Sequence, residues 1–352
     1  MQYVSDLKRP DVLEEGKTVI GRSKEVRLIL ENLERAENKA VLLVGAPGIG
    51  KTAIVKVLAY EVASNKDELI NQTSLVDLNT PKVLAQTSSE AEVGQKITAL
   101  LQKLNPSKTK TVLVIDDLQM LLENGNTSNA TSLINILDAQ ISDGAVTLLM
   151  LLSTDAYRKH IEKHPIVNRL NVINVEPLEP NILKSALLGH KTLLQAHYSL
   201  TVTEEAIDSA CSLANRYYKE KSQPASTLDL LDSTAASVRL SNKNAKEIIA
   251  QLTETYNKHC KQAIEDVKDR DLYLLYHTIF SKISVVLLSK IADNFILSDE
   301  DTTQQKLEKI GLILKELAEV SSQGIQAVSP LEVEAVVAGD TGIPIGILIS
   351  VE

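Results

Sequence analysis

The first half of the chain alternates short apolar runs with stretches in which apolar residues recur at helical spacing. Apolar runs occupy residues 40–44, 111–115 and 145–152, and continuous runs of this length are typical of parallel strands buried on both faces. Residues 24–37 and 52–63 instead place apolar side chains three or four positions apart, which predicts helices. Strands that alternate with helices predict an α/β domain in which helices flank a parallel sheet.

The second half of the chain has a helical pattern, since the strand signal fades from about residue 176. Residues 279–291 are apolar on most faces and are therefore expected to be packed. Residues 329–347 are expected to return to a strand near their end, whereas the polar residues 1–18 are expected to be irregular. Helices are predicted at several places in 179–240 and at 244–266, 271–294 and 301–320.

The most specific motif follows the first apolar run. Eight consecutive residues fit the phosphate-binding pattern G-x-x-x-x-G-K-[ST] between a predicted strand and a predicted helix, and a chance glycine-rich turn is the alternative. In such a loop the glycines let backbone N–H groups face the phosphates, and the following helix directs its positive end at the same anion. Lys51 is expected to reach the outer phosphates, and Thr52 to hold Mg²⁺ through its hydroxyl. The residues expected to bind nucleotide here are Gly45, Ala46, Pro47, Gly48, Ile49, Gly50, Lys51, Thr52 and Ala53.

Polar residues end the next two apolar runs. Asp116 and Asp117 follow the run at 111–115, and Asp116 is expected to position Mg²⁺ and its water ligands. An Asp-Asp pair at a strand end is often only a turn, but the phosphate loop earlier in the chain strengthens the metal interpretation. Ser153 and Thr154 end the following run, and a hydroxyl there could contact the γ-phosphate or the attacking water. The alternative is that they cap the turn that follows.

Composition narrows the classes of function. Apolar residues make up 44% of the 352 residues, enough for a large core, but there is no Trp and there are only two Phe. The net charge of −9 and the scarce aromatics argue against general binding of nucleic acid. Cys211 and Cys260 have no metal-ligand spacing and are expected to be reduced thiols. The N-terminus has no apolar run of the signal-peptide kind, so we expect a cytoplasmic protein that uses ATP and Mg²⁺.

These motifs, together with several further segments, resemble the first ATPase module of the Clp-type AAA+ unfoldases, a family that remodels proteins. The resemblance covers about residues 15–240 and 326–347. It rests on a box ahead of the first helix, the phosphate loop with its helix, a segment after the third strand, two lid segments and a connector. These are, in order, Val19–Arg22, Gly45–Val55, Asp155–His164, Arg216–Tyr218, Pro224–Asp232 and Val328–Pro344.

The resemblance implies a fold, a domain order and partners. It implies an AAA+ module with an all-helical lid and a helical segment that corresponds by position to the family's middle domain. Val19 and Ile20 would pack on the adenine, and the chain would form a homo-oligomeric ring, such as a hexamer, that acts on protein partners without a role for membranes or nucleic acid. The implied boundaries are an N-terminal linker at 1–18, the large nucleotide-binding domain at 19–175, the lid at 176–240, the middle-domain-like segment at 241–325 and a connector-like segment at 326–352.

The chain departs from the family pattern at positions that control hydrolysis. The family has Asp-Glu where this chain has Asp116-Asp117, and Asp is one methylene shorter than Glu. Positioning errors near 1 Å can cost about 100-fold in rate, so slow turnover is expected. Of the two family arginines that reach the neighbouring subunit's nucleotide, only Arg169 matches, because Leu170 replaces the other. A surface ion pair is the alternative role for Arg169.

The parts that handle substrate also depart from the family. Residues 84–93 match the family's substrate-gripping loop but contain no aromatic residue and no glycine, and Ser226 replaces the lid lysine. No substrate-receiving domain is expected before residue 15, and no second module after residue 352.

Three functions stay open on this basis. The chain is expected to be an ATP-binding AAA+ protein of Clp type, a slow ATPase that assembles and remodels or scaffolds protein partners. The alternative is a catalytically degenerate, nucleotide-dependent scaffold without unfolding activity, and a DNA-linked AAA+ regulator is the least favoured. The expected catalytic residues are Asp117, Thr154 and Arg169, and the expected metal ligands are Thr52 and Asp116.

Overall fold

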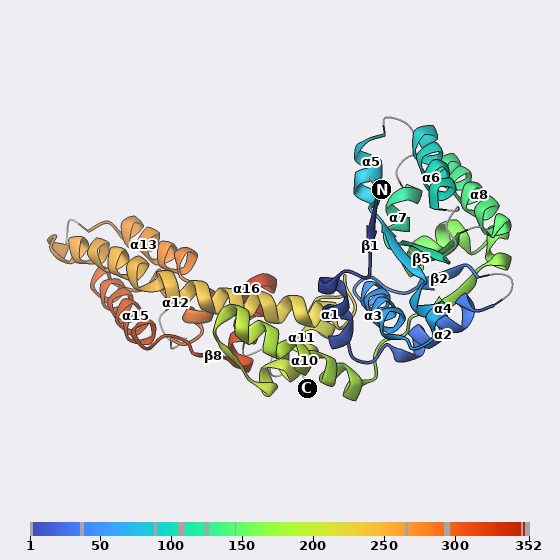
Figure 1. Cartoon of the computed structure of the whole chain (residues 1–352). Coiled ribbons are helices and arrows are strands. Elements are labelled where there is room, and N and C mark those ends of the chain that lie inside the picture. The colour runs from blue at the N-terminus through green and yellow to red at the C-terminus, as the bar shows by residue number, and fades with distance from the viewer. Residues whose placement is uncertain are drawn as a thin grey trace. The chain divides into compact units, whose positions relative to one another are not determined.

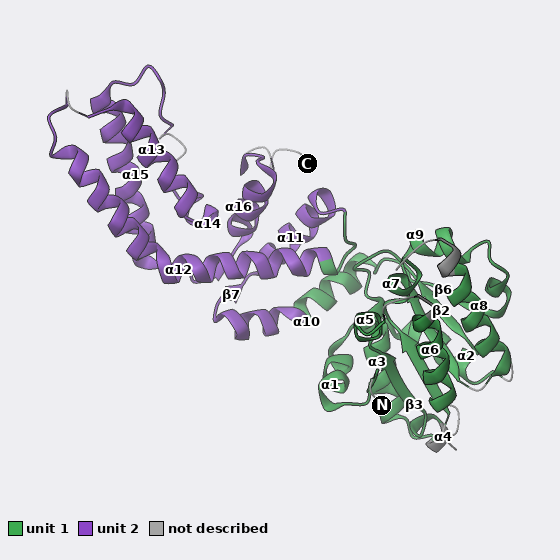
Figure 2. Cartoon of the chain, turned by 90° about the horizontal axis from the view of Figure 1, so that it is seen from above, with its two compact units in different colours: residues 1–189, 220–225 green, residues 190–219, 226–352 purple. Residues whose placement is uncertain are grey.

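The computed structural model describes residues 3–345 and 348, except 36–38, 88–89, 105–109, 124–126, 145, 265–266 and 292–295. The chain forms two compact units (Figure 2). Unit 1 consists of residues 1–189 and 220–225, and unit 2 consists of residues 190–219 and 226–352. The two units are described in turn.

Unit 1 is built on a mostly parallel six-stranded sheet (Figure 1). Only β1 is antiparallel, pairing with β3 so that Val4 lies opposite Leu78. The three strands predicted from apolar runs are confirmed as β2, β4 and β5, and they are buried along their whole length. The strands are β1 Val4–Asp6, β2 Val41–Val44, β3 Ser74–Leu78, β4 Thr111–Ile115, β5 Thr147–Leu152 and β6 Asn171–Asn174, in the order β1-β3-β4-β5-β2-β6.

Helices cover both faces of this sheet, so side chains that alternate along each strand enter two separate apolar layers. Leu43 and Leu149 enter the layer under α1–α3, whereas Leu42 and Leu148 enter the layer under α6–α8. The helices are α1 Pro10–Thr18, α2 Ser23–Leu33, α3 Lys51–Ser64, α4 Glu68–Asn71, α5 Thr80–Ala85, α6 Glu90–Leu104, α7 Leu118–Glu123, α8 Thr127–Asp143 and α9 Thr154–Ala156, with a π-helical turn at Tyr157–Ile161, a 3-10 turn at Pro165–Arg169 and the start of α10 Pro180–Tyr198.

The N-terminal segment differs from the expectation that residues 1–18 are irregular. It forms β1 and α1, and α1 begins with Pro10 in its first turn. Gly16 lets α1 approach α3 closely, because an added Cβ would lie 2.2 Å from the backbone oxygen of Lys56. Pairing with β3 and packing on α3 are tertiary contacts. A short polar stretch carries no local pattern that predicts them.

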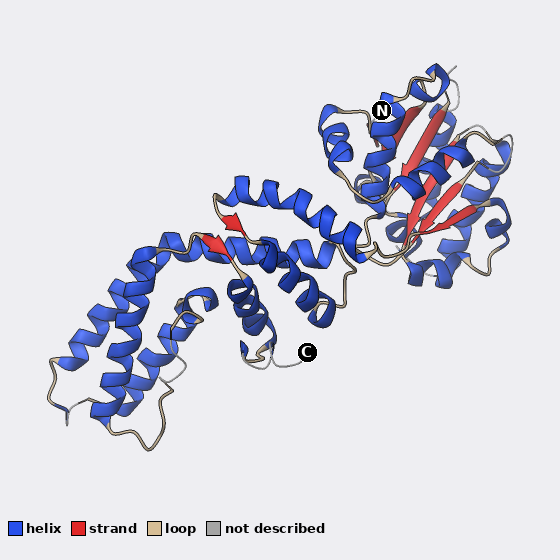
Figure 3. Ribbon diagram, turned by 90° about the horizontal axis from the view of Figure 1, so that it is seen from below, coloured by secondary structure: helices blue, strands red, loops and turns tan. Residues whose placement is uncertain are grey.

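Among the described residues of unit 2, the regular structure is helical except for the short parallel pair β7 and β8 (Figure 3). The predicted break between 240 and 244 is wrong, since one continuous helix, α12, runs through it. A strand was expected near the end of 329–347, but none forms at residues 329–345, and residues 346–347 lie outside the described residues. Pro330 begins α16 there, with a capping box between Ser329 and Glu332. The elements are β7 Thr201–Val202, α11 Glu204–Tyr217, α12 Ala225–Cys260, α13 Asp269–Lys282, α14 Val285–Leu288, α15 Thr303–Gln323, β8 Ala327–Val328 and α16 Pro330–Thr341, after the end of α10.

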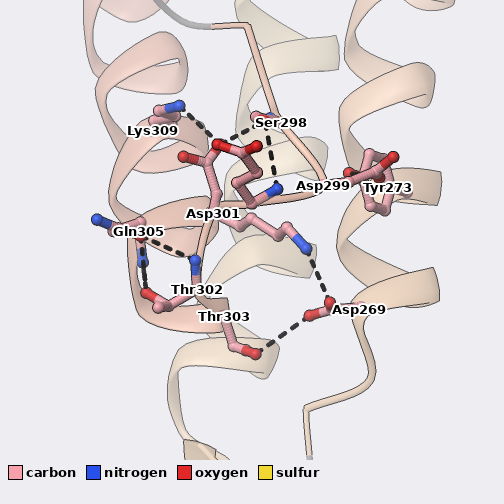
Figure 4. A network of polar contacts seen from close by, with 11 residues as sticks. Asp269, Tyr273, Ser298, Asp299, Asp301, Thr302, Thr303, Gln305 and Lys309 are labelled. Atoms are coloured by element: carbon pink, nitrogen blue, oxygen red, sulfur yellow. Dashed lines mark hydrogen bonds and ion pairs between the residues drawn. The ribbon is translucent and has the colours of Figure 1, made fainter.

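The buried Lys306 near the N-terminal end of α15 pairs with Asp269 at the N-terminal end of α13, and Figure 4 shows the polar residues around this pair. The Lys306 side chain is 2% exposed, and its Nζ lies 2.7 Å from Asp269 Oδ2 and 5.0 Å from the centre of the Tyr273 ring. Thr303 Oγ1 donates to the same carboxylate at 3.1 Å, and Lys309 pairs with Asp301 at 2.7 Å. These contacts satisfy the buried ammonium and stabilise the helical unit far from the phosphate loop in sequence.

Across the described residues, no helix combines the length and the hydropathy needed to span a bilayer. The same residues contain no group of three or more His, Cys, Asp or Glu arranged to hold a metal ion.

Candidate functional site

The phosphate loop connects β2 to α3 in unit 1. It begins directly after Val44, and α3 begins at Lys51. Gly48 and Gly50 have φ of +77° and +102°, in the left-handed region that favours glycine. Lys51 Nζ donates to the backbone oxygens of Gly45 and Ala46 at 2.7 and 3.0 Å, so the loop curls around the ammonium group. The first N–H groups of α3 have no acceptor within the helix, and such groups bind anions.

A buried arginine supports this loop from behind. Arg22 is 4% exposed and donates to the backbone oxygens of Ile49 and Glu176 and to the Glu25 carboxylate. The sequence analysis placed Arg22 only in a box near the adenine and did not identify this contact. A buried arginine ahead of a helix was the available signal, but its acceptors lie far away in sequence.

The segment 220–225, which returns to unit 1 between α11 and α12, also contacts the loop. Ser222 N donates to the oxygen of Pro47 at 2.8 Å, and Ala225 N donates to the oxygen of Gly48 at 3.3 Å. A Cβ on Gly48 would lie 3.0 Å from both Ala225 Cβ and the Ser222 oxygen, so this approach requires glycine. The sequence analysis assigned this whole segment to the lid at 176–240 and did not predict the backbone contact.

The predicted metal ligands Thr52 and Asp116 are brought together. Thr52 Oγ1 donates to Asp116 Oδ2 at 2.9 Å and lies 3.2 Å from Oδ1. Burial raises the pKa of Asp116, although the Thr52 hydrogen bond acts in the opposite direction. Burial also lowers the pKa of Lys51, and the charge of Asp116 partly offsets this effect. The Thr52 hydroxyl and the Asp116 carboxylate supply the kind of oxygen ligands that Mg²⁺ prefers.

The three predicted catalytic residues lie in different settings. Asp117 is exposed at the end of β4, immediately before α7. Thr154 begins α9 and is half-buried. Its neighbour Ser153 caps α9 by accepting from Ala156 N, and it also donates to Gln119 Oε1 at 2.7 Å. The capping alternative therefore holds for Ser153.

Arg169 makes the surface ion pair that was the alternative interpretation. Its Nη1 lies 3.1 Å from Asp138 Oδ1 on α8 and also donates to the hydroxyl of Ser142. The arginine side chain remains 48% exposed. Such exposed pairs contribute little to stability, about 0–1 kcal/mol, so the guanidinium can exchange this partner for another at low cost.

The predicted adenine box lies against the start of α10. An added Cβ on Gly21 would lie 2.3 Å from Ile182 Cγ2 and 3.1 Å from Leu178 Cδ2. Val19 is half-buried, whereas Ile20 is 41% exposed and carries an unusually open apolar side chain.

Asp77 lies at the same edge of the sheet as Asp116 and was missed by the sequence analysis. It lies near the end of β3, two residues after Leu75, and therefore faces the apolar layer under α1–α3 that Leu75 enters. Burial raises the pKa of Asp77 to about 6, with further increases from the charges of Asp116 and Asp117. Its Oδ1 has no hydrogen-bond partner among the described residues. One Asp in a strand-like run was the only sequence signal.

Two protein family models match the chain, one after the other along the sequence. The ATPase family associated with various cellular activities (AAA) matches residues 41–176, and the AAA lid domain matches residues 183–278. The AAA match thus includes the phosphate loop, both carboxylates and Arg169.

Curated relatives match nearly the whole chain. The ClpA homolog of Trieres chinensis, an ATP-dependent Clp protease ATP-binding subunit, is 25% identical over 346 residues, which are 98% of this chain and 37% of the relative. The ClpC subunit of Staphylococcus aureus is 28% identical over 332 residues, 93% of this chain and 38% of the relative. The chain therefore spans less than two fifths of the length of these relatives.

Solved structures of S. cerevisiae Hsp104 are similar over one part of the chain. The Hsp104–ADP complex aligns with a TM-score of 0.60 and 27% identity over 69% of this chain and 42% of the Hsp104 chain. The Hsp104–casein complex aligns with a TM-score of 0.58 and 28% identity over 68% of this chain. The chain thus carries one ATPase module, an AAA domain followed by an AAA lid domain, and it is similar to the Clp-type AAA+ proteins ClpA, ClpC and Hsp104.

Proposed function

We propose that the chain binds ATP with Mg²⁺, hydrolyses it slowly, and uses nucleotide to assemble and to remodel or scaffold protein partners. The observation that carries the proposal is the convergence of Lys51, Thr52 and Asp116 at the point where the phosphate loop, α3 and β4 meet. The left-handed conformations of Gly48 and Gly50 and the hydrogen bond from Arg22 to Ile49 hold the loop in that geometry. Preorganisation of this kind lowers the cost of binding.

Each residue has a role that follows from its position. Lys51 would exchange the backbone oxygens of Gly45 and Ala46 for phosphate oxygens, since its ammonium already points into the loop. Thr52 and Asp116 would hold Mg²⁺ directly or through water, and Val19 and Ile20 would contact the base. Bound magnesium would neutralise charge on the phosphates. Thr154 at the end of β5 is proposed to contact the outermost phosphate or the attacking water.

Slow hydrolysis is proposed because Asp117, which follows β4, would be the carboxylate that orients the attacking water. It is exposed, and its side chain is one methylene shorter than the Glu found in the family. In phosphoryl transfer the protein mainly positions groups and neutralises charge, so a misplaced carboxylate affects rate more than affinity.

Self-association is proposed through Arg169, whose exposed guanidinium would reach the nucleotide of a neighbouring copy. Head-to-tail contacts of this kind close into rings when the rotation per subunit allows. Protein partners are proposed because solved relatives include Hsp104 bound to casein. We also propose domain boundaries after residues 18, 175, 240 and 325, and a cytoplasmic location. Both proposals rest on the resemblance to Clp-type proteins.

The second candidate is a nucleotide-dependent scaffold without unfolding activity. Asp117, Leu170 and Ser226 favour it, as do residues 84–93, which lack an aromatic side chain; residues 88–89 of that stretch lie outside the described residues. A DNA-linked regulator has no specific observation in its favour.

ATP turnover with a Lys51→Ala control separates these candidates. Slow, Mg²⁺-dependent phosphate release that disappears in the Lys51→Ala variant supports the ATPase. Nucleotide binding without release over hours favours the scaffold. No nucleotide binding at saturating ATP and Mg²⁺ refutes both.

A further inference from the structure

The last strand of the sheet in unit 1 has one free edge. β6 pairs with β2 on one side, and no described strand pairs with its other side. Asn171 N donates to the oxygen of Ala40, and Val175 N donates to the oxygen of Val44, so these groups point toward β2. Backbone groups alternate in direction along a strand, so the N–H and C=O groups of Val172 and Asn174 face outward. Such an edge is a template for another strand.

A groove of about 580 Å³ follows this edge, between β6 and α2. One wall consists of five consecutive residues, 170–174, which shows that the groove tracks the strand. The other wall consists of Lys24, Leu28 and Asn32 on one stripe of α2, and of Arg35 just beyond the end of that helix. The helix and the strand run in opposite directions, because Arg35 contacts Asn171 at the start of β6 and Arg22 contacts Glu176 beyond its end. Both elements are labelled in Figure 2.

The groove is apolar in the middle and charged at its ends. Leu28, Leu170 and Ile173 supply the apolar part. Arg35 stands at the end near Asn171, with contacts only to amide oxygens and no carboxylate partner among the described residues. At the other end the exposed Lys24 and Glu176 have opposite charges, while Glu25 is paired with Arg22 at 2.8 Å. The excess positive charge is therefore at the Arg35 end.

We propose that this groove binds an extended segment of a partner protein, which adds as a strand to β6 and places a carboxylate beside Arg35. The four residues of β6 span roughly 13 Å at about 3.3 Å per residue, enough for the main-chain hydrogen bonds of a short added strand. Alternate side chains of that segment would lie on Leu28, and its acidic residue would pair with the guanidinium. This goes beyond the proposed ATPase, since it assigns a site and a chemical class of partner that the phosphate loop does not require.

Strand addition at β6 can be tested by measuring how synthetic peptides bind to the full chain, using fluorescence anisotropy. The probes are seven-residue peptides of alternating Val and Thr with two Asp residues at the N-terminal end, at the C-terminal end, or replaced by two Lys. One of the two acidic peptides is expected to bind at least tenfold more tightly than the basic peptide, and which one does so gives the strand direction. Arg35→Glu is expected to reverse that preference. Equal binding of acidic and basic peptides, or no binding of either acidic peptide at millimolar concentration, overturns the proposal.

Peptide backbone methylation tests strand addition without altering the protein. N-methyl groups on one alternate set of amides are expected to abolish binding, whereas methylation of the other set leaves it within about threefold. Val172→Pro, which removes an outward N–H and leaves the pairs with β2, is expected to weaken binding at least tenfold with no change in the stabilisation by ATP. Asn174→Pro, which removes the other outward N–H at an exposed position, serves if the Val172→Pro variant does not fold. Tolerance of both methylated sets, or weakened self-association of Val172→Pro in place of weakened peptide binding, shows that no partner strand is added there.

Discussion

The hydroxyl of Thr52 lies 2.9 Å from Asp116 Oδ2, although 63 residues separate the two in sequence. Thr52 is the second residue of α3, and Asp116 directly follows β4. Parallel strands bring their carboxyl ends to one edge of a sheet, and α3 begins at that edge because it follows β2. The pair therefore joins the phosphate loop to the carboxylate expected to hold Mg²⁺.

Removal of the Thr52 hydroxyl is expected to weaken nucleotide binding only when Mg²⁺ is present. Wild-type protein should gain about 2.7 kcal/mol of stability at ATP concentrations 100-fold above the dissociation constant. Thr52→Ala should lose most of the Mg²⁺-dependent part of the ATP-induced rise in melting temperature, while Thr52→Ser should keep it. Lys51→Ala should lose the rise with and without Mg²⁺. Wild-type melts that do not respond to saturating ATP and Mg²⁺ contradict the nucleotide site.

Asp117→Glu is expected to raise the ATPase rate about tenfold, or about 1.4 kcal/mol of barrier, with little change in ATP affinity. The added methylene extends the carboxylate toward the water, while Lys51, Thr52 and Asp116 keep their contacts with nucleotide and metal. Steady-state phosphate release and nucleotide titrations measure the two quantities separately. If the wild type already turns over several ATP per second and Asp117→Glu slows it, Asp117 is a competent water-orienting group and the slow-ATPase reading fails.

Arg169→Ala is expected to reduce nucleotide-dependent self-association, as measured by sedimentation with and without ATP. The matched control is Asp138→Ala, which breaks the 3.1 Å ion pair but leaves the arginine available to a neighbouring copy. The control should associate at least as well as the wild type. If both variants associate equally poorly, Arg169 acts only through its surface pair. A wild-type monomer at tens of micromolar under both conditions argues against a ring.

Asp77→Asn is expected to stabilise unit 1 at neutral pH in the absence of nucleotide and Mg²⁺. The folded-state pKa of about 6 lies above the ordinary value of 3.8, so the folded chain retains a proton that the unfolded chain releases. Below about pH 4, Asp77 is protonated in both states and does not destabilise the fold. The free energy of unfolding then falls as the pH rises from about 4 to about 6 and stays at the lower value above that. The variant should gain roughly 1 kcal/mol at pH 7.5, after allowance for solvent screening, and little at pH 4.

The readout for this prediction is the melting transition of unit 1 without nucleotide. That transition is identified beforehand as the one whose temperature ATP raises in the wild type. The exposed Glu14→Gln on α1 is the control for the loss of one negative charge. A gain for Asp77→Asn that is the same at pH 4 and pH 7.5 would show that ionisation of Asp77 is not its cause.

Asp269→Ala is expected to destabilise unit 2 more than Lys306→Met. The first change leaves the 2%-exposed ammonium of Lys306 without its carboxylate, at a cost of roughly 2–3 kcal/mol in unfolding free energy. The second replaces the charge by an apolar chain of similar length that still packs on Tyr273, and its cost should be below about 1.5 kcal/mol. Denaturant unfolding, followed through the helical unit, compares them. A reversed order would mean that the ion pair itself stabilises the bundle.

Long or fully apolar patterns predicted their elements correctly. Residues 111–115 form β4 with the expected bounds, and the helix expected at 52–63 is α3, one residue longer at each end. The breaks were less predictable. Nothing local ends a helix between 240 and 244, and α12 continues because its buried side chains repeat along one face. No helix was predicted at the start of residues 329–347, yet Pro330 starts α16 because proline suits the first turn of a helix.

The sequence by itself determined the α/β class, the phosphate loop and the identities of Lys51, Thr52 and Asp116, because loop chemistry and buried strands leave strong local patterns. Only the tertiary structure decided that Arg22 supports the loop and that Ser222 and Ala225 contact Pro47 and Gly48. The same holds for the placement of Asp77 near Asp116 and for the ion pair of Arg169 with Asp138. Each of these contacts joins residues from different elements. Hydrogen bonds and burial of that kind depend on how strands and helices meet in space, and no spacing along the chain encodes them.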